Sequence, residues 1–268
     1  MRRRDDKRSR VGRVVRIAAA AGCALAVWVS GPGSVADGGE VAVAPLQAQS
    51  NDGGEETSDE DLRPTDNMDA EEIARGIQKF YKRTEDYQAS FKQVYTDVAA
   101  GEEKKTWGKV YFKKPGQMRW DYYESSDRKQ RKKTLVSDGK VFWIYELEFQ
   151  QVFKQCLQES KLPTSLKFLM GQGNLLADFD IEFTEASTEE APELELTPKE
   201  PTPKYKKLHF QVDPKTLQVA KTTVFGPYGN TNTIEFANPR LNQNLPDSGF
   251  AFEPPEGARL LNPKKECE

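Results

Sequence analysis

The apolar positions of the chain follow two different periods. Between residues 69 and 84 they recur every three or four residues, which predicts an amphipathic helix whose apolar face holds Ile73, Ile77, Phe80, Tyr81 and Thr84. Asp66 or Asn67 is expected to cap the start of this helix. From residue 86 onward apolar and polar residues alternate instead, as in β-strands that are buried on one face.

The alternating pattern predicts about eleven short strands in close succession, the last of them at Gly249–Phe252. Asp138-Gly139 is a strong signal for a tight hairpin turn. One segment breaks the pattern, because Pro163 is expected to begin a short helix with Leu166, Leu169 and Met170, which ends near Gly171. The sequence therefore predicts a mainly β (α+β) fold, an antiparallel meander that curls toward a barrel. The two amphipathic helices are then the candidates to cover the hydrophobic cavity of the curled sheet.

Charge divides the 268 residues into three segments. Residues 1–36 hold eight Arg or Lys and two Asp, and the uncharged apolar stretch 17–29 precedes small residues at 34–36, so this segment is predicted to be a signal peptide that exports the chain. Residues 37–66 form an acidic segment without apolar periodicity, predicted to be a disordered linker. Residues 67–263 form the expected β domain, followed by the tail 264–268.

No motif points to catalysis, so we expect no enzyme, no catalytic residue, no cofactor and no metal site. The single histidine, His209, lies in a predicted strand and is interpreted as a surface residue. The basic run Arg128–Lys133 is interpreted as a solvated loop; an anionic lipid or an acidic partner is the alternative, and nucleic acid is not expected. After export Cys156 and Cys267 remain, and the sequence leaves open whether they form a disulfide.

Several segments, taken in order, resemble the family of the periplasmic outer-membrane lipoprotein carrier protein LolA. They are Ala89–Gln93, Gly108–Trp120 with its turn at Lys113–Gly116, Val136–Tyr145 with the Ser-Asp-Gly turn, and Phe250–Gly257 with Phe-x-Phe-x-Pro-Pro-x-Gly. Pro163, Leu166 and Leu169 fall where this family places a lid helix. The resemblance implies an unclosed β-barrel with helices covering a hydrophobic cavity.

The resemblance also implies a function, which is that of a periplasmic chaperone or carrier. Such a carrier accepts acylated lipoproteins, its cargo, from a lipoprotein-releasing ABC transporter of the inner membrane and delivers them to a receptor of the outer membrane. We expect a monomer in the periplasm. The alternatives with the same fold are an outer-membrane-anchored receptor, which lipidation at Cys23 would support, and a lipid-sensing regulator; an exported hydrolase is a further alternative.

The candidate lipid-binding residues come from both helices and from the strands. Strand alternation and helical spacing select eight candidates: Ile77, Tyr81, Phe91, Met118, Trp120, Leu166, Leu169 and Met170. The alternative for each of them is that it is an ordinary core residue. Lys114 stands where the family usually has an arginine that latches the lid through backbone carbonyls. A lysine keeps the charge but lacks the planar fork of donors, and its alternative is a solvated turn residue.

Overall fold

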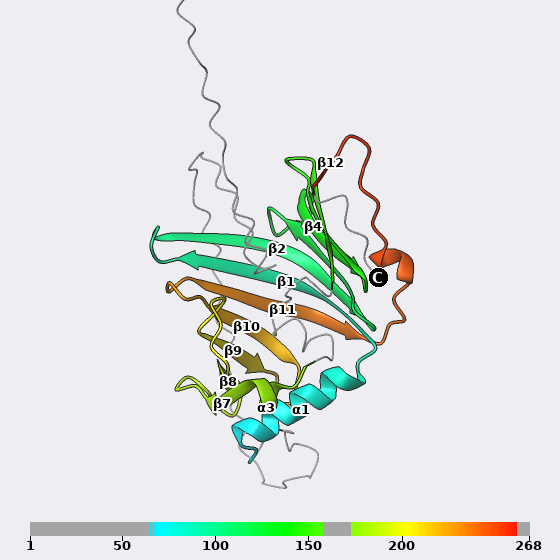
Figure 1. Cartoon of the computed structure of the whole chain (residues 1–268). Coiled ribbons are helices and arrows are strands. Elements are labelled where there is room, and N and C mark those ends of the chain that lie inside the picture. The colour runs from blue at the N-terminus through cyan, green and yellow to red at the C-terminus, as the bar shows by residue number, and fades with distance from the viewer. Residues whose placement is uncertain (1–64, 66, 158–172, 262–268) are drawn as a thin grey trace, which may run out of the picture.

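The computed structural model describes residues 65, 67–157 and 173–261. The elements, labelled as in Figure 1, are α1 (Ala70–Arg83), β1 (Asp86–Asp97), β2 (Glu102–Lys113), β3 (Gln117–Tyr123), β4 (Arg131–Asp138), β5 (Val141–Glu146), β6 (Gln151–Cys156), α3 (Leu175–Asp178), β7 (Phe179–Phe183), β8 (Glu193–Pro198), β9 (Lys207–Val212), β10 (Val219–Phe225), β11 (Thr231–Leu241), the 3-10 helix η1 (Asp247–Phe250) and β12 (Arg259–Leu261). The predicted helix 163–170 and the tail lie outside the described residues. So does nearly all of the predicted signal peptide and linker, and these boundaries remain predictions.

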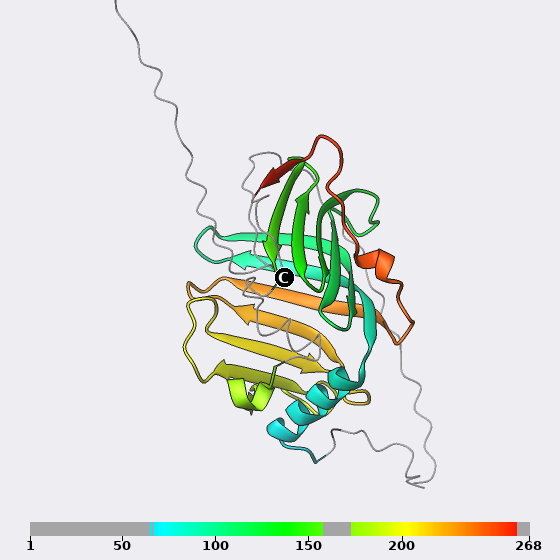
Figure 2. The same cartoon turned by 45° about the vertical axis from the view of Figure 1, so that its right-hand side comes forward.

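The twelve described strands form one sheet, in the order β12-β6-β5-β4-β3-β2-β1-β11-β10-β9-β8-β7. Neighbouring strands are antiparallel except β12, which runs parallel to β6. The sheet curls but leaves β12 and β7 unpaired with each other, and α1 lies beside its lower half (Figures 1 and 2). The predicted unclosed, mainly β architecture is therefore confirmed.

Strand β1 joins the two halves of the sheet. It pairs along its whole length with β2, its neighbour in sequence, and over most of its length with β11, which lies about 140 residues further along the chain. A register shift between Gln88 and Ser90 bends the β1–β11 ladder. Because β1 has a hydrogen-bonded strand on each side, its pairing fixes the face of the sheet on which each of its side chains lies.

One face of the sheet, which we call the inner face, carries Tyr87, Phe91 and Trp120 and forms a single apolar core with α1 and α3. Ile73, Ile77 and Tyr81 of α1 are buried in this core, as their helical spacing predicts. The cap of α1 differs from the prediction, because Asp69 and not Asp66 or Asn67 is the N-cap. Asp69 accepts from the Glu72 amide at 2.8 Å, and Glu72 accepts from the Asp69 amide at 2.9 Å, which is a capping box.

The opposite, outer face of β3–β6 is covered by the segment that follows β11. Phe252 packs against the rings of Trp143 and Tyr145, and η1 contacts β3 and β4. The predicted strand Gly249–Phe252 was therefore wrong: Phe250 is buried, but it ends η1, and the final strand is β12. Pro246, Pro254 and Pro255 flank this segment, and proline cannot donate to a strand ladder.

Two further differences concern short segments. Arg131, Lys132 and Lys133 belong to β4 and not to a loop, so only the first half of the basic run lies in the turn after β3. The short helix α3 was not predicted. It is capped by Asn174, and its Leu175 amide donates to Gln78 of α1 at 3.0 Å.

Gly108 lies opposite Phe91 on β1 and opposite Tyr122 on β3. A Cβ atom there would collide with the Phe91 ring and with the Asp121 carbonyl oxygen. We expect Gly108→Ala to lower the free energy of unfolding by about 1–3 kcal/mol, because overpacking forces the Phe91 ring out of place. Urea unfolding measures this.

Gly249→Ala is the control, because a Cβ at Gly249 meets nothing within 4 Å. It should change the free energy of unfolding by less than about 0.5 kcal/mol. Equal effects of the two substitutions would contradict the assigned role of Gly108.

Candidate functional site

Three aromatic rings pack together on the inner face. Phe91 lies edge-on to both Trp120 and Tyr122, with 5.1 Å between ring centroids in each pair, and Trp120 stacks on Tyr122 at 6.3 Å. Trp120 is 2% exposed and Tyr122 is 3% exposed. Period-two spacing on β3 places both rings on the same face as Met118, which is also buried. The structure therefore brings together the predicted Phe91, Met118 and Trp120.

Helix α1 contributes the predicted Ile77 and Tyr81 to the same core. The Tyr81 hydroxyl oxygen accepts a hydrogen bond from the Val219 amide of β10 at 3.2 Å, which ties the helix to the second half of the sheet. Tyr81 also packs against Tyr87 of β1, with 6.4 Å between ring centroids. Burial raises the pKa of Tyr81 above its ordinary value, so the hydroxyl stays protonated at neutral pH.

The predicted lid residues Leu166, Leu169 and Met170 lie outside the described residues. The hydrophobic cavity that they were expected to cover therefore stays a prediction, as does contact of any candidate residue with an acyl chain.

Lys114 contacts helix α1, whereas the lid helix that it was predicted to latch lies outside the described residues, so the latch itself remains a prediction. Its Nζ donates to the backbone carbonyl of Lys82, in the last turn of α1, at 2.6 Å. A cation at this end of a helix also complements the helix dipole. One hydrogen bond to one carbonyl is what a lysine provides in place of the arginine fork.

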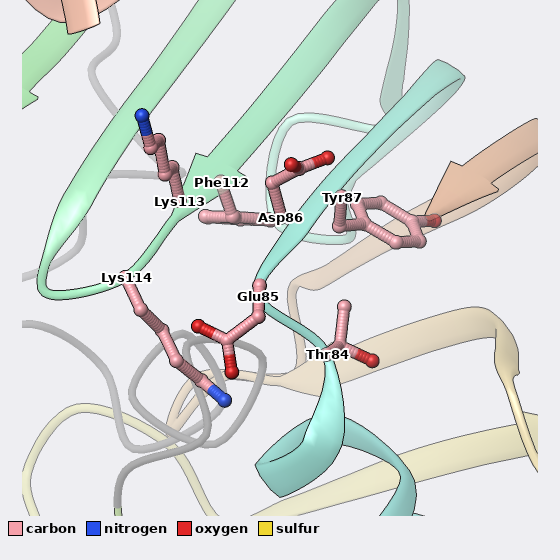
Figure 3. Close-up of a pocket in the computed structure, with 7 residues that line it drawn as sticks. All are labelled: Thr84, Glu85, Asp86, Tyr87, Phe112, Lys113 and Lys114. Carbon is pink, nitrogen blue, oxygen red and sulfur yellow. The ribbon is translucent and has the colours of Figure 1, made fainter. Parts of the chain in front are cut away.

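A small pocket lies at the junction of α1, β1 and β2, lined by Thr84–Tyr87 and Phe112–Lys114 (Figure 3). In Figure 3 the Lys114 side chain extends from the turn after β2 past Glu85 toward the end of α1. Buried Asp86 fixes this junction, because its carboxylate accepts from the amides of Gln243 at 2.8 Å and Leu245 at 3.2 Å. The contact of Lys114 with α1 thus lies beside a junction that Asp86 ties to the segment after β11.

Lys133 is an inner-face residue that the sequence analysis missed. It pairs in register with Tyr122 on β3 and Glu146 on β5, and its Nζ lies 4.5 Å from the centroid of the Tyr122 ring. In the described part of the chain no ion pair involves Lys133, whereas its neighbours Arg131 and Lys132 pair with carboxylates. Its position within a run of basic residues resembled a solvated surface, and only its parity with Leu135 indicated otherwise.

Burial shifts the pKa of Lys133 and that of Glu146, the residue that faces it on β5. It lowers the pKa of Lys133 to about 8, against an opposing effect of the Glu146 charge. Burial also raises the pKa of Glu146, which Lys133 counteracts. The inner face thus keeps a cation at neutral pH in surroundings that disfavour it.

Two buried donors beside Lys133, Trp120 Nε1 and Tyr122 Oη, have no hydrogen-bond partner among the residues that the structure describes. Leaving such a group unpaired in the interior costs about 1–3 kcal/mol. Burial raises the pKa of Tyr122, so its hydroxyl remains a donor.

His209 lies on the outer face, where its Nε2 is 2.8 Å from Glu195 Oε2, and Lys207 donates to the same carboxylate. It is partly buried on this face and belongs to a cross-strand hydrogen-bond network with Glu195 and Lys207. Across the described ranges, no group of three or more His, Cys, Asp or Glu side chains is arranged to hold a metal ion. Cys156 is disulfide-bonded, and the other cysteines lie outside the described residues.

Comparison with known proteins identifies the family. The family model described as outer membrane lipoprotein carrier protein LolA matches residues 82–253, which include β1–β11 and η1. The chain belongs to the LolA family. This confirms the resemblance drawn from the sequence, and the carriers of this family bind lipoprotein cargo and are not enzymes.

Curated relatives carry the same description at low identity. The outer-membrane lipoprotein carrier protein of Methylococcus capsulatus is 28% identical over 189 residues, which are 70% of this chain and 86% of the relative. That of Chromobacterium violaceum is 27% identical over 187 residues, 69% of this chain and 85% of the relative.

Solved structures with a similar fold include a LolA superfamily protein from Nitrosomonas europaea, at 13% identity and a TM-score of 0.38, covering 69% of this chain and 98% of that one. An uncharacterized conserved protein from Thermus thermophilus has 12% identity and a TM-score of 0.46, covering 72% and 98%. Within residues 65, 67–157 and 173–261, no helix has the length and apolar character needed to cross a membrane.

The hydrogen bond between Lys114 and α1 yields one prediction. Removing the donor in Lys114→Met should speed hydrogen exchange of the last-turn amides of α1 about three- to tenfold, because one charge-assisted hydrogen bond to the helix is lost. Lys114→Arg, which keeps the positive charge and adds hydrogen-bond donors, should protect them at least as well as the native lysine. Exchange followed by mass spectrometry measures both.

Lys82→Met is the matched control, because it removes a lysine side chain but keeps the carbonyl that accepts the bond. Exchange in Lys82→Met should remain native. If Lys114→Met also exchanged at the native rate, Lys114 would hold no part of the helix in place.

Lys133 yields a prediction on pH. Its pKa of about 8 in the folded state lies below the value of about 10.4 expected in the unfolded chain. Between these values the unfolded state binds more protons, so the contribution of Lys133 to stability rises with pH and is least favourable below pH 8. Lys133→Met lacks this contribution.

The test is urea unfolding of the native chain and of Lys133→Met at pH 7 and pH 9.5. We expect Lys133→Met to be the more stable at pH 7 and to lose this advantage as the pH rises. The charge of Glu146 raises the pKa of Lys133 and the charge of Lys104 lowers it. Both residues are present in the native chain and in Lys133→Met. A difference between them that does not change with pH would contradict the burial of a charged Lys133.

Proposed function

We propose that this chain binds the acyl chains of lipoproteins released from the inner membrane and carries them through the periplasm to the outer membrane. The observation that carries the proposal is the LolA family match across residues 82–253. The inner face supports it, because strand and helix place aromatic and methionine side chains on one apolar surface. We further propose that an inner-membrane ABC transporter supplies the cargo and an outer-membrane receptor takes it.

The energetics explain why such a carrier is needed. Moving an acyl chain of about sixteen carbons from an apolar site into water costs roughly 13 kcal/mol, at about 0.8 kcal/mol per methylene. A lipoprotein with several chains therefore needs an apolar surface during transit. Release requires that the next site bind the chains more tightly than the carrier does.

Helix α1 is suited to compete with cargo for the inner face. Its apolar side, with Ile77 and Tyr81, already packs there, and Lys114 and Val219 each hold it through one hydrogen bond. An acyl chain that displaced part of this packing would break few hydrogen bonds of α1, and α1 would return to the inner face once the acyl chain had moved to a tighter site. We propose that α1 closes over the empty inner face and moves aside for cargo.

A charged residue at the centre of the inner face should abolish binding. We expect Trp120→Glu to weaken binding of an acylated lipoprotein by at least tenfold, because the carboxylate occupies the apolar surface. Copurification of a lipoprotein with the tagged protein measures this. Trp120→Leu, which keeps an apolar side chain, should weaken binding less than Trp120→Glu does, and this separates the effect of the charge from the loss of the indole ring.

Trp107→Glu is the matched control, because Trp107 alternates with inner-face Gly108 and lies on the outer face of β2. It should bind as the native chain does, and circular dichroism checks that each variant is folded. Depletion followed by membrane fractionation tests the role itself. If outer-membrane lipoproteins still reached the outer membrane, the carrier role would be wrong, and a mature N-terminus acylated at Cys23 would indicate a receptor instead.

A further inference from the structure

The rim of the inner face carries hydrogen-bond donors that have no acceptor among the described residues. Tyr122, Lys133 and Glu146 form the last cross-strand row of β3, β4 and β5 that points to the inner face before the exposed turns 124–130 and 147–150. The next rows along β3, at Trp120 and Met118, belong to the apolar core. Polar and apolar groups thus follow one another along a single strand.

Three groups of this region can donate hydrogen bonds. Within the described ranges Trp120 Nε1 and Tyr122 Oη are buried without a hydrogen-bond partner, and the Lys133 ammonium lies over the Tyr122 ring and forms no ion pair with a carboxylate. An indole and an ammonium group can only donate, and a protonated phenol donates one hydrogen. The complementary ligand group is therefore one that supplies oxygen acceptors.

We propose that Trp120, Tyr122 and Lys133 bind the acceptor oxygens at the head of a bound acyl chain. This inference rests on the proposed function and adds the orientation of the bound acyl chain. The head group lies at the rim beside the turns, and the hydrocarbon runs along β3 past Met118 toward α1. Successive inward side chains of a strand are about 7 Å apart, so the rows from Tyr122 to Met118 follow about ten carbons of an extended chain.

The arrangement also explains why the donors are retained. Trp120 Nε1 and Tyr122 Oη have no acceptor within the described part of the chain. An acyl ligand that brings ester, amide or phosphate oxygens satisfies these donors, whereas a plain hydrocarbon does not. The site would therefore distinguish an acyl ligand from other apolar molecules.

The test uses purified protein and three pyrene-labelled ten-carbon chains, which end in a hydrogen atom, a methyl ester or a phosphate. Pyrene fluorescence reports binding. We expect the native chain to bind at least one of the two oxygen-ended probes about tenfold or more tightly than the hydrogen-ended probe. A preference for the ester indicates the linkage found in acylated proteins, and a preference for the phosphate indicates a phospholipid head.

Tyr122→Phe and Lys133→Met should each weaken binding of the preferred oxygen-ended probe about three- to tenfold and leave the hydrogen-ended probe unchanged. Lys154→Met is the matched control, because Lys154 lies over the Trp143 ring at 5.3 Å on the outer face. It should bind all three probes as the native chain does. Thermal unfolding confirms that each variant is folded.

The outcomes separate the two proposals. If the native chain binds all three probes equally, or if Tyr122→Phe and Lys133→Met weaken all three alike, the donor site is wrong and the apolar binding surface stands. If no probe binds at all, the proposed carrier function fails, and the donor site fails with it.

Discussion

The pairing of β1 with β11 is the constraint on which the rest of the structure depends. It closes the longest separation in sequence among the strand pairs and joins the half built from β2–β6 to the half built from β7–β10. Buried Gln93 and Asn232 reinforce it with a side-chain hydrogen bond of 2.7 Å between the two strands. Without this pairing, the aromatic residues of β3 and the apolar residues of β9 and β10 would not face a common core.

The same constraint positions both parts of the candidate site. The start of β1 is held by Asp86, which fixes the segment after β11, and this junction carries the turn with Lys114. Further along β1, Phe91 packs over Gly108 onto Trp120 and Tyr122. A polar contact to the helix and an apolar centre are thus placed at fixed positions along one strand.

The sequence predicts those parts of the structure in which apolar residues recur at a regular spacing. Alternation along β3 was enough to place Met118 and Trp120 on the inner face, and helical spacing was enough for Ile77 and Tyr81. The segment Phe250–Phe252 misled because burial under a loop and burial in a strand produce the same apolar spacing, and only the flanking prolines distinguish them. Lys133 was missed because a charged residue within a basic run is usually solvated, and the direction of its side chain depends on the register of β4.

An open sheet has two edges, and each is a place where a foreign strand could add. On one side, the short parallel strand β12 occupies the free hydrogen-bonding groups of β6. On the other, β7 is only five residues long and carries Asp180 and Glu182, charges that resist the approach of another strand. Because each edge is protected in its own way, the sheet can stay unclosed without offering a template for aggregation.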